Sequence, residues 1–347
     1  MHPTWDILHG FIYAAMGLYA AAGVLFALKV RRAAWIVYGA GCAVAVAGWI
    51  YRWHDAGHVP LQNLFEVFLT LGALMFPITL FSRRFLDVGR EGGDAFIGLL
   101  VLFPIGFVFS DETKPMMPAL QSFLFVPHVA AYMVAYVVMG KALVQALGAY
   151  AVKTRLAMLV FVLPRLGLAL YAYASGGFVP LPVPTLLAGW LLAPATAAGY
   201  DAGERFLDGS GAALAVGIGA DLLFWALIAL LVWRARPLAR GDRLRAERDA
   251  HVVVRLGFPV LTLGLVLGAV WGKLAWGDYW NWDPKELWSL VSWLIFLGYL
   301  HVRYLYGKRY ARANASLVLA GVVAIVLTLL WVNLAGVFSG GLHSYAT

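Results

Sequence analysis

Residues 254–276 read VRLGFPVLTLGLVLGAVWGKLAW, an apolar run that contains only two basic side chains, Arg255 and Lys273. A helix that crosses a bilayer needs about 20 mainly apolar residues, whereas a strand of a membrane barrel alternates apolar and polar side chains over about ten. Because the apolar character here is long and continuous, the stretch predicts a membrane-spanning helix rather than a barrel strand.

The same pattern recurs along the chain of 347 residues, of which 62% are hydrophobic and 13% charged. A soluble domain of this composition would expose large apolar patches. We therefore expect an all-α integral membrane protein, a polytopic bundle of about ten transmembrane helices with eight to eleven possible, forming a single domain over residues 1–347. The candidate spans are residues 7–29, 34–52, 64–82, 95–110, 124–150, 156–175, 182–199, 211–233, 254–276, 286–305 and 314–337. The N-terminus lacks a positively charged leader, so the first helix is expected to be retained.

The placement of the basic residues predicts how the chain is threaded through the membrane. Of the 26 lysines and arginines, 18 fall in five clusters on what would be one side, and the positive-inside rule makes that side cytoplasmic. Residues 53–63, 111–123 and 276–285 and both termini then face outward. An even number of the three segments between residues 156 and 233 must cross, and the proline-led stretch 182–199 is expected to re-enter or lie in the interface. The polar stretch 237–252 is expected to be a short solvated helix extension.

Residues 271–288 hold five of the fourteen tryptophans, and we expect an external loop there. Two interpretations fit. Tryptophans gather at the headgroup level of membranes as an aromatic belt, or they form a platform for a flat, hydrophobic ligand such as a porphyrin, whose acidic groups would meet Lys285 and indole N–H groups. Asp283, Pro284 and Glu286 are typical of a helix start, in which the aspartate is the N-cap.

The segment WGDYWNWDPKELWSL, residues 276–290, resembles the WWD motif of the haem-handling proteins of cytochrome c maturation. Its DPKE continuation most resembles the CcsA family, also called ResC. Arg255–Pro259, Trp293–His301, Pro118–Ser122 and Gly341–Tyr345 fit that family too. The resemblance covers roughly residues 34–150 and 250–347, whereas residues 155–245 are longer than expected and are interpreted as an insertion.

The resemblance also implies two haem sites. His128, next to Pro127 at the outward end of one span, and His343, after the last span, would be the axial ligands of an external haem b. His301 would belong to an inner site whose opposite ligand comes from a CcsB/ResB-like partner. The remaining predicted cofactor contacts are Trp276, Tyr279, Trp280, Trp282 and Asp283. From the residues alone, a single apolar-face histidine is more often a satisfied core residue, and His301 could instead extend to the cytoplasmic interface.

The function that the resemblance implies is that of a haem-handling subunit of a holocytochrome c synthase in the plasma membrane. The chain would move haem outward and present it for covalent attachment to the CxxCH motif of apocytochrome c, with a thioredoxin-like reductant and without nucleic acid. Whether the chain is itself the enzyme or one part of a haem lyase complex stays open. A polytopic solute transporter and a b-type haem electron-transfer subunit are the alternatives. The single cysteine, Cys42, allows no internal disulfide, so thiol chemistry would belong to a partner.

A third pattern, His54 and His58 at i, i+4 spacing, is compatible with a zinc site. Gly57 and Pro60 oppose a regular helix there, and no third ligand is near in the sequence. We therefore do not expect a metal at this position.

Overall fold

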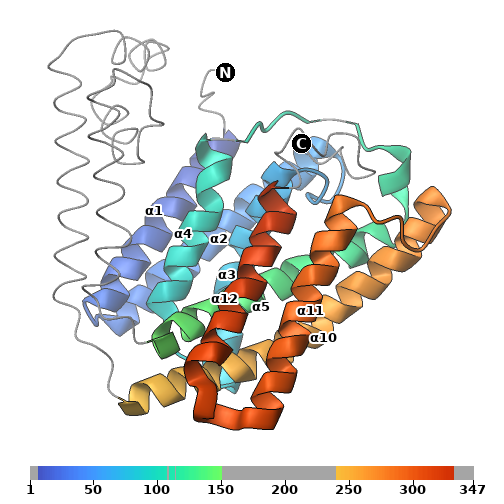
Figure 1. Ribbon diagram of the computed structural model, residues 1–347. Coiled ribbons are helices and arrows are strands. Elements are labelled where there is room, and N and C mark those ends of the chain that lie inside the picture. The colour runs from blue at the N-terminus through green and yellow to red at the C-terminus, as the bar shows by residue number, and fades with distance from the viewer. Residues whose placement is uncertain (1–6, 108, 114, 151–239, 332–347) are drawn as a thin grey trace, which may run out of the picture. The chain divides into compact units, whose positions relative to one another are not determined.

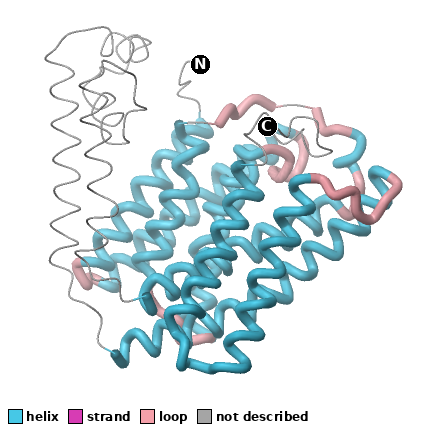
Figure 2. Tube along the Cα trace, viewed as in Figure 1, coloured by secondary structure: helices cyan, strands magenta, loops and turns pink. Residues whose placement is uncertain are grey.

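The computed structural model describes residues 7–107, 109–113, 115–150 and 240–331, and every regular element in these ranges is helical (Figures 1 and 2). The expectation of an all-α protein is therefore confirmed. The predicted spans between residues 156 and 233, the insertion 155–245 up to residue 239, and both termini lie outside the described residues, so the total of ten helices stays a prediction.

The first four helices are α1 (Ile7–Ala27), α2 (Arg31–Ala56), α3 (Leu64–Phe85) and α4 (Glu91–Phe107). They enclose a core to which α1 contributes Tyr19, α2 contributes Tyr38 and α3 contributes Phe65 and Leu69. Other faces of α3 reach a second core, because Leu71 and Met75 pack there. The third helix is thus the element shared by the two cores.

The second core belongs mainly to the later helices, α5 (Phe125–Tyr150), α10 (Arg240–Trp276), α11 (Pro284–Tyr306) and α12 (Ala311–Val326). A short 3₁₀ helix, η1 (Pro118–Gln121), precedes α5. Another, η2 (Gly307–Tyr310), joins α11 to α12, and a π-helical turn, η3 (Leu327–Trp331), follows α12. The most extensive helix pairing is that of α10 with α5.

Six helical runs within the described residues are long and apolar enough to cross a membrane. They are Ile7–Ala27, Arg31–Ala56, Leu64–Phe85, Phe125–Gly148, Gly241–Trp276 and Pro284–Leu330, the last of which contains α11, η2 and α12. The expected span at 95–110 corresponds to α4, which has 17 residues. The chain is thus a multi-pass helical membrane protein.

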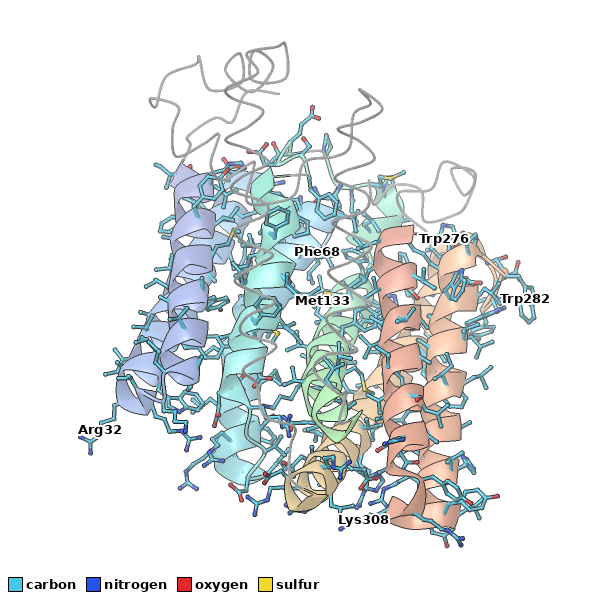
Figure 3. All side chains as sticks on the ribbon, turned by 60° about the vertical axis from the view of Figure 1, so that its left-hand side comes forward. Arg32, Phe68, Met133, Trp276, Trp282 and Lys308 are labelled. Carbon is cyan, nitrogen blue, oxygen red and sulfur yellow. The ribbon has the colours of Figure 1, made fainter. Side chains whose placement is uncertain are left out.

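The ends of the described bundle differ in character, and Figure 3 shows Arg32 and Lys308 at one end and Trp276 and Trp282 toward the other. We call the turns 28–30, 86–90 and 307–310 the basic end, and the connections 57–63, 109–124 and 277–283 the tryptophan end. This separation agrees with the clustering of basic residues in the sequence. Which end faces the cytoplasm stays a prediction.

Two expected boundaries are corrected. From Arg240 onward, the supposed solvated extension 237–252 is part of α10, and one face of it is buried, since Glu247 and Asp249 are 1% and 5% exposed. The Glu247 carboxylate is 2.5 Å from Arg303 Nε and accepts a hydrogen bond from Asn314 of α12, so tertiary partners compensate its burial. The tryptophan-rich segment 271–288 is a loop only at 277–283, because α10 continues to Trp276 and α11 begins at Pro284.

Candidate functional site

The loop 277–283 has a defined beginning and end. Gly277 has φ +91°, a conformation that only glycine adopts readily, and it lets the chain leave α10 abruptly. At the other end Asp283 is the predicted N-cap of α11, in a capping box with Glu286, and accepts a hydrogen bond from the Lys285 amide at 2.9 Å. The Glu286 carboxylate also accepts a hydrogen bond from the Asn281 amide at 2.7 Å. Backbone amides therefore hold the carboxylates of Asp283 and Glu286.

The aromatic residues of this segment divide into buried and exposed members. Trp271 is 1% exposed, donates its indole N–H to the Ala119 carbonyl and packs edge-on against Trp276 with ring centroids 4.6 Å apart. Tyr279 and Trp282 are 59% and 70% exposed. Trp280 lies between these extremes, and its Nε1 is buried without a hydrogen-bond partner in the described part of the chain. The tryptophans thus do not share one role.

A cavity of about 160 Å³ at the tryptophan end brings together four predicted site residues: His128, Trp276, Tyr279 and Trp280. Its other walls come from the start of α3, from α5, α10 and α11, and from the turn η3, which contributes Thr328 and Leu329. Predicted contacts Trp282 and Asp283 are not part of its lining. The structure therefore brings a predicted histidine together with three predicted aromatic residues from a distant part of the chain, and their role as cofactor contacts stays a prediction.

His128 is held from three sides. Its Nδ1 is 2.9 Å from the Gly264 carbonyl, which can only accept, so Nδ1 carries the proton and Nε2 the lone pair. The ring stacks on Trp271, with centroids 5.6 Å apart and 22° between planes, and meets Tyr132 edge-on at 5.1 Å. A histidine that ligates a metal usually donates its other ring N–H in this way. The arrangement fits an axial haem ligand on a cavity wall.

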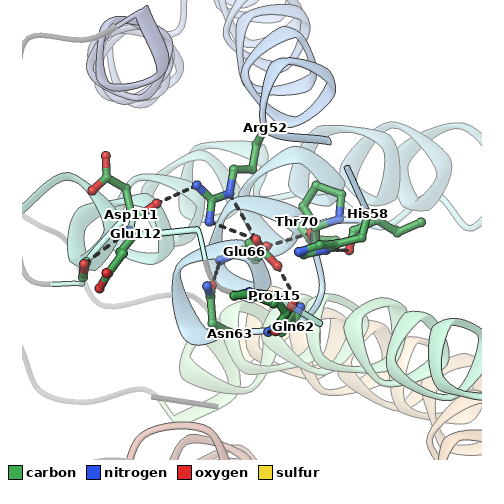
Figure 4. A network of polar contacts seen from close by, with 12 residues as sticks. Arg52, His58, Gln62, Asn63, Glu66, Thr70, Asp111, Glu112 and Pro115 are labelled. Atoms are coloured by element: carbon green, nitrogen blue, oxygen red, sulfur yellow. Dashed lines mark hydrogen bonds and ion pairs between the residues drawn. The ribbon is translucent and has the colours of Figure 1, made fainter. Parts of the chain in front are cut away.

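Next to the cavity lies a buried polar network that the sequence analysis did not predict (Figure 4). Arg52 and Glu66, each 1% exposed, form an ion pair with Nη2 and Oε1 3.0 Å apart. Arg52 also donates to the Asp111 carbonyl, and Glu66 accepts from the Gln62 amide at 2.8 Å. Gln62 in turn reaches the Pro115 carbonyl. The ion pair and Gln62 therefore link the two connections that flank the cavity, 57–63 and 109–117.

A sequence signal for this pair existed. Asn63 caps α3 by accepting from the Glu66 amide at 2.9 Å, and Glu66 is the acidic residue of the first turn. An arginine near the end of an apolar run is itself a functional or structural signal, because a charge in a membrane helix needs a partner. Only the tertiary structure identifies Glu66 as that partner.

His301 is exposed on α11 and donates from Nδ1 to the Leu297 carbonyl at 2.8 Å. It lies near the basic end and does not line the cavity that contains His128. Arg303, two residues further on, points instead into the bundle, toward Glu247. His343 lies outside the described residues, so its predicted pairing with His128 is not tested here.

His54 and His58 lie on either side of the end of α2. The α2 helix ends at Ala56, before Gly57 in the left-handed conformation, as the sequence predicted. His58 turns its Nδ1 toward the Val59 carbonyl. No group of three histidine, cysteine or acidic side chains suitable for a metal ion occurs in the described ranges.

The fold and the site together define a multi-pass helical membrane protein with a histidine-containing aromatic cavity at one end of its bundle. Comparison with known proteins then assigns the family. The family described as "Cytochrome C assembly protein" matches residues 10–338, so the chain belongs to that family.

Relatives named cytochrome c biogenesis protein CcsA support the assignment. That of Trichormus variabilis is 31% identical over 85% of this chain and 82% of the relative. That of Microcystis aeruginosa is 31% identical over 88% of this chain and 84% of the relative. That of Nostoc punctiforme is 32% identical over 85% of this chain and 82% of the relative. The resemblance expected from the tryptophan-rich motif is thereby confirmed, and with it a general role in cytochrome c biogenesis.

Proposed function

We propose that this protein is the haem-presenting subunit of a holocytochrome c synthase, which holds haem b at the tryptophan end for transfer to apocytochrome c. The observation that carries the proposal is the cavity that combines His128, in the tautomer suited to ligation, with Trp276, Tyr279 and Trp280. Family membership supports the process but names neither the cofactor nor the site.

The residues present fit a haem. Aromatic side chains offer stacking area for a porphyrin face, and the buried Nε1 of Trp280, which has no partner among the described residues, suits a carboxylate such as a propionate. Lys285 also lines the cavity and supplies a positive charge. The cavity is smaller than the roughly 300–1,000 Å³ of enclosed ligand pockets, so haem would be only partly covered and would stay accessible to a second protein.

When bound, haem would supply the vinyl groups to which the two thiols of a CxxCH motif add. The chain's own contribution would be position, because His128 and the aromatic walls of the cavity would hold the porphyrin and restrict its orientation. We propose His343 as the ligand on the opposite face. Both thiols would belong to apocytochrome c, and a thioredoxin-like reductant would keep them reduced.

The proposal also includes an inner haem site at His301, completed by a CcsB/ResB-like membrane partner. The exposure of His301 on the outer surface of α11 supports it, because a ligand shared with a partner must be accessible from outside the chain. The proposed location is the plasma membrane, with the tryptophan end outward as the basic residues indicate.

The test is the haem spectrum of the complex purified with His128→Gly or His343→Gly. We expect each variant to lose the low-spin bis-histidine spectrum or most of its haem, and added imidazole to restore it partly by filling the vacant axial position. His54→Gly is a matched control, because His54 is an exposed histidine near the same end and is not part of the cavity. Unchanged spectra in both His128→Gly and His343→Gly would rule out the ligand assignment.

A further inference from the structure

Three glycines of α10, Gly257, Gly264 and Gly268, face α5. Their spacings of seven and four residues place them on one side of the helix. A Cβ at Gly257 would lie 2.8 Å from Val138, and one at Gly264 would lie 3.2 Å from the Tyr132 ring. The missing side chains thus allow close approach of α5 to α10, as small residues commonly do between membrane helices.

Gly268 differs from the other two because its neighbour is the candidate ligand. A Cβ at this position would lie 2.5 Å from Cε1, 2.9 Å from Nδ1 and 3.3 Å from Nε2 of His128. Carbon atoms that are not bonded to each other have their optimal separation at about 3.5–4.0 Å. The imidazole therefore occupies the space that a side chain at residue 268 would need.

The ring cannot move away without losing its other contacts. Trp271 stacks on it, Tyr132 meets its edge, and the hydrogen bond from Nδ1 to the Gly264 carbonyl fixes its rotation. That hydrogen bond also sets the tautomer that leaves the lone pair on Nε2. A displacement of the ring would therefore change both the position and the protonation pattern of the group that ligates iron.

We propose that Gly268 is a positioning residue for His128, and that its lack of a side chain gives the imidazole the one placement from which Nδ1 reaches Gly264 while Nε2 serves as the axial ligand. The inference rests on the proposed function, because it assumes that His128 ligates haem. It adds a residue of α10 that offers no side chain to a ligand in the cavity and acts through the placement of the histidine.

The experiment compares Gly268→Ala with Gly298→Ala in the purified full-length complex. Gly298 is a helical glycine of α11 at which an added Cβ meets nothing within 4 Å, so it controls for the change of residue type. We expect Gly268→Ala to lose the low-spin spectrum or several-fold in haem content at equal protein level, and imidazole to restore it partly. Gly298→Ala should behave as the unmodified protein. A normal, imidazole-insensitive spectrum in Gly268→Ala would overturn the inference.

The double variant His128→Gly with Gly268→Ala keeps the test decisive if Gly268→Ala alone fails to accumulate. Removing the ring removes the clash, so the double variant should accumulate as well as His128→Gly does. Its rescue by imidazole should be weaker, because the added methyl occupies the place of the ring. If neither Gly268→Ala nor the double variant accumulates, Gly268 serves helix packing only, which overturns the inference.

The same set of variants distinguishes failure of the inference from failure of the proposed function. If His128→Gly retains an unchanged spectrum, His128 is not a ligand, and the proposed function and the inference fail together. If His128→Gly loses the spectrum while Gly268→Ala does not, only the inference fails.

Discussion

At the scale of single residues, the tryptophans of the loop are no longer equivalent. Trp280 lines the cavity with a buried N–H that has no hydrogen-bond partner among the described residues, whereas Trp282 has φ +57° and is 70% exposed. The belt and platform interpretations, which the sequence left as alternatives, thus lead to different expectations for these two side chains. Trp282 is placed as an interfacial residue would be, and Trp280 as a ligand contact would be.

This difference predicts unequal effects of Trp280→Leu and Trp282→Leu. An aromatic contact contributes about 0.5–1.5 kcal/mol beyond its buried area, so loss of Trp280 should weaken haem retention up to about tenfold. Trp282→Leu should leave retention nearly unchanged. Haem extraction by a competing apoprotein from equal amounts of each variant measures this. Equal retention in both variants would contradict the role assigned to Trp280.

A second prediction at this scale concerns Asp283, which both starts α11 and was expected to contact the cofactor. Its carboxylate is held by the amides of the first turn. Asp283→Ala should reduce the stability of the protein by about 0.5–2 kcal/mol, the usual value of an N-cap, while Asp283→Asn should lose far less. Thermal unfolding in detergent measures both. If Asp283→Asn loses haem at unchanged stability, the carboxylate has a ligand role as well.

At the scale of elements, the Arg52–Glu66 pair connects α2 and α3 beneath two connections of the tryptophan end. Replacing either partner by leucine leaves an unpaired buried charge and should destabilise the protein by about 3–5 kcal/mol. The double variant Arg52→Leu with Glu66→Leu should be more stable than either single variant, because no charge is left unpaired. The unfolding midpoint of the three variants tests this coupling.

Asp87→Ala provides the comparison for the buried pair. Asp87 pairs with Arg83 at 3.3 Å, but its side chain is 85% exposed. Such a surface pair contributes about 0–1 kcal/mol, so its loss should hardly move the midpoint.

For the buried pair, additive losses of stability in the double variant of Arg52 and Glu66 would show that the two residues act independently.

At the scale of the whole molecule, the orientation in the membrane follows from charge and can be measured. Asn281→Cys at the tryptophan end and Arg245→Cys at the basic end both introduce exposed thiols. The single native cysteine, Cys42, is buried and should give little background. In intact cells an impermeant thiol reagent should label Asn281→Cys and not Arg245→Cys. Labelling of both or of the basic end alone would contradict the proposed route of haem outward.

Helix type and boundaries could largely be predicted from the sequence, because both depend on local chemistry. The expected span 64–82 appears as Leu64–Phe85, and Asp283 with Pro284 starts α11 as predicted. The helical start of α10 was predicted but its burial was not, since its charged residues look solvated in sequence and are buried only through partners such as Arg303 and Asn314. Total helix number and the role of residues 155–245 stay predictions.

The sequence by itself determined that this is a helical membrane protein and which family it belongs to, because apolar run length, charge placement and a dense tryptophan motif are all local properties. Only the tertiary structure decided which of these residues act together. His128 contacts Trp271 and the Gly264 carbonyl, and its ring fills the space next to Gly268. All three residues lie more than 130 positions further along the chain. Such contacts depend on how closely α5 packs on α10, and no local pattern encodes that distance.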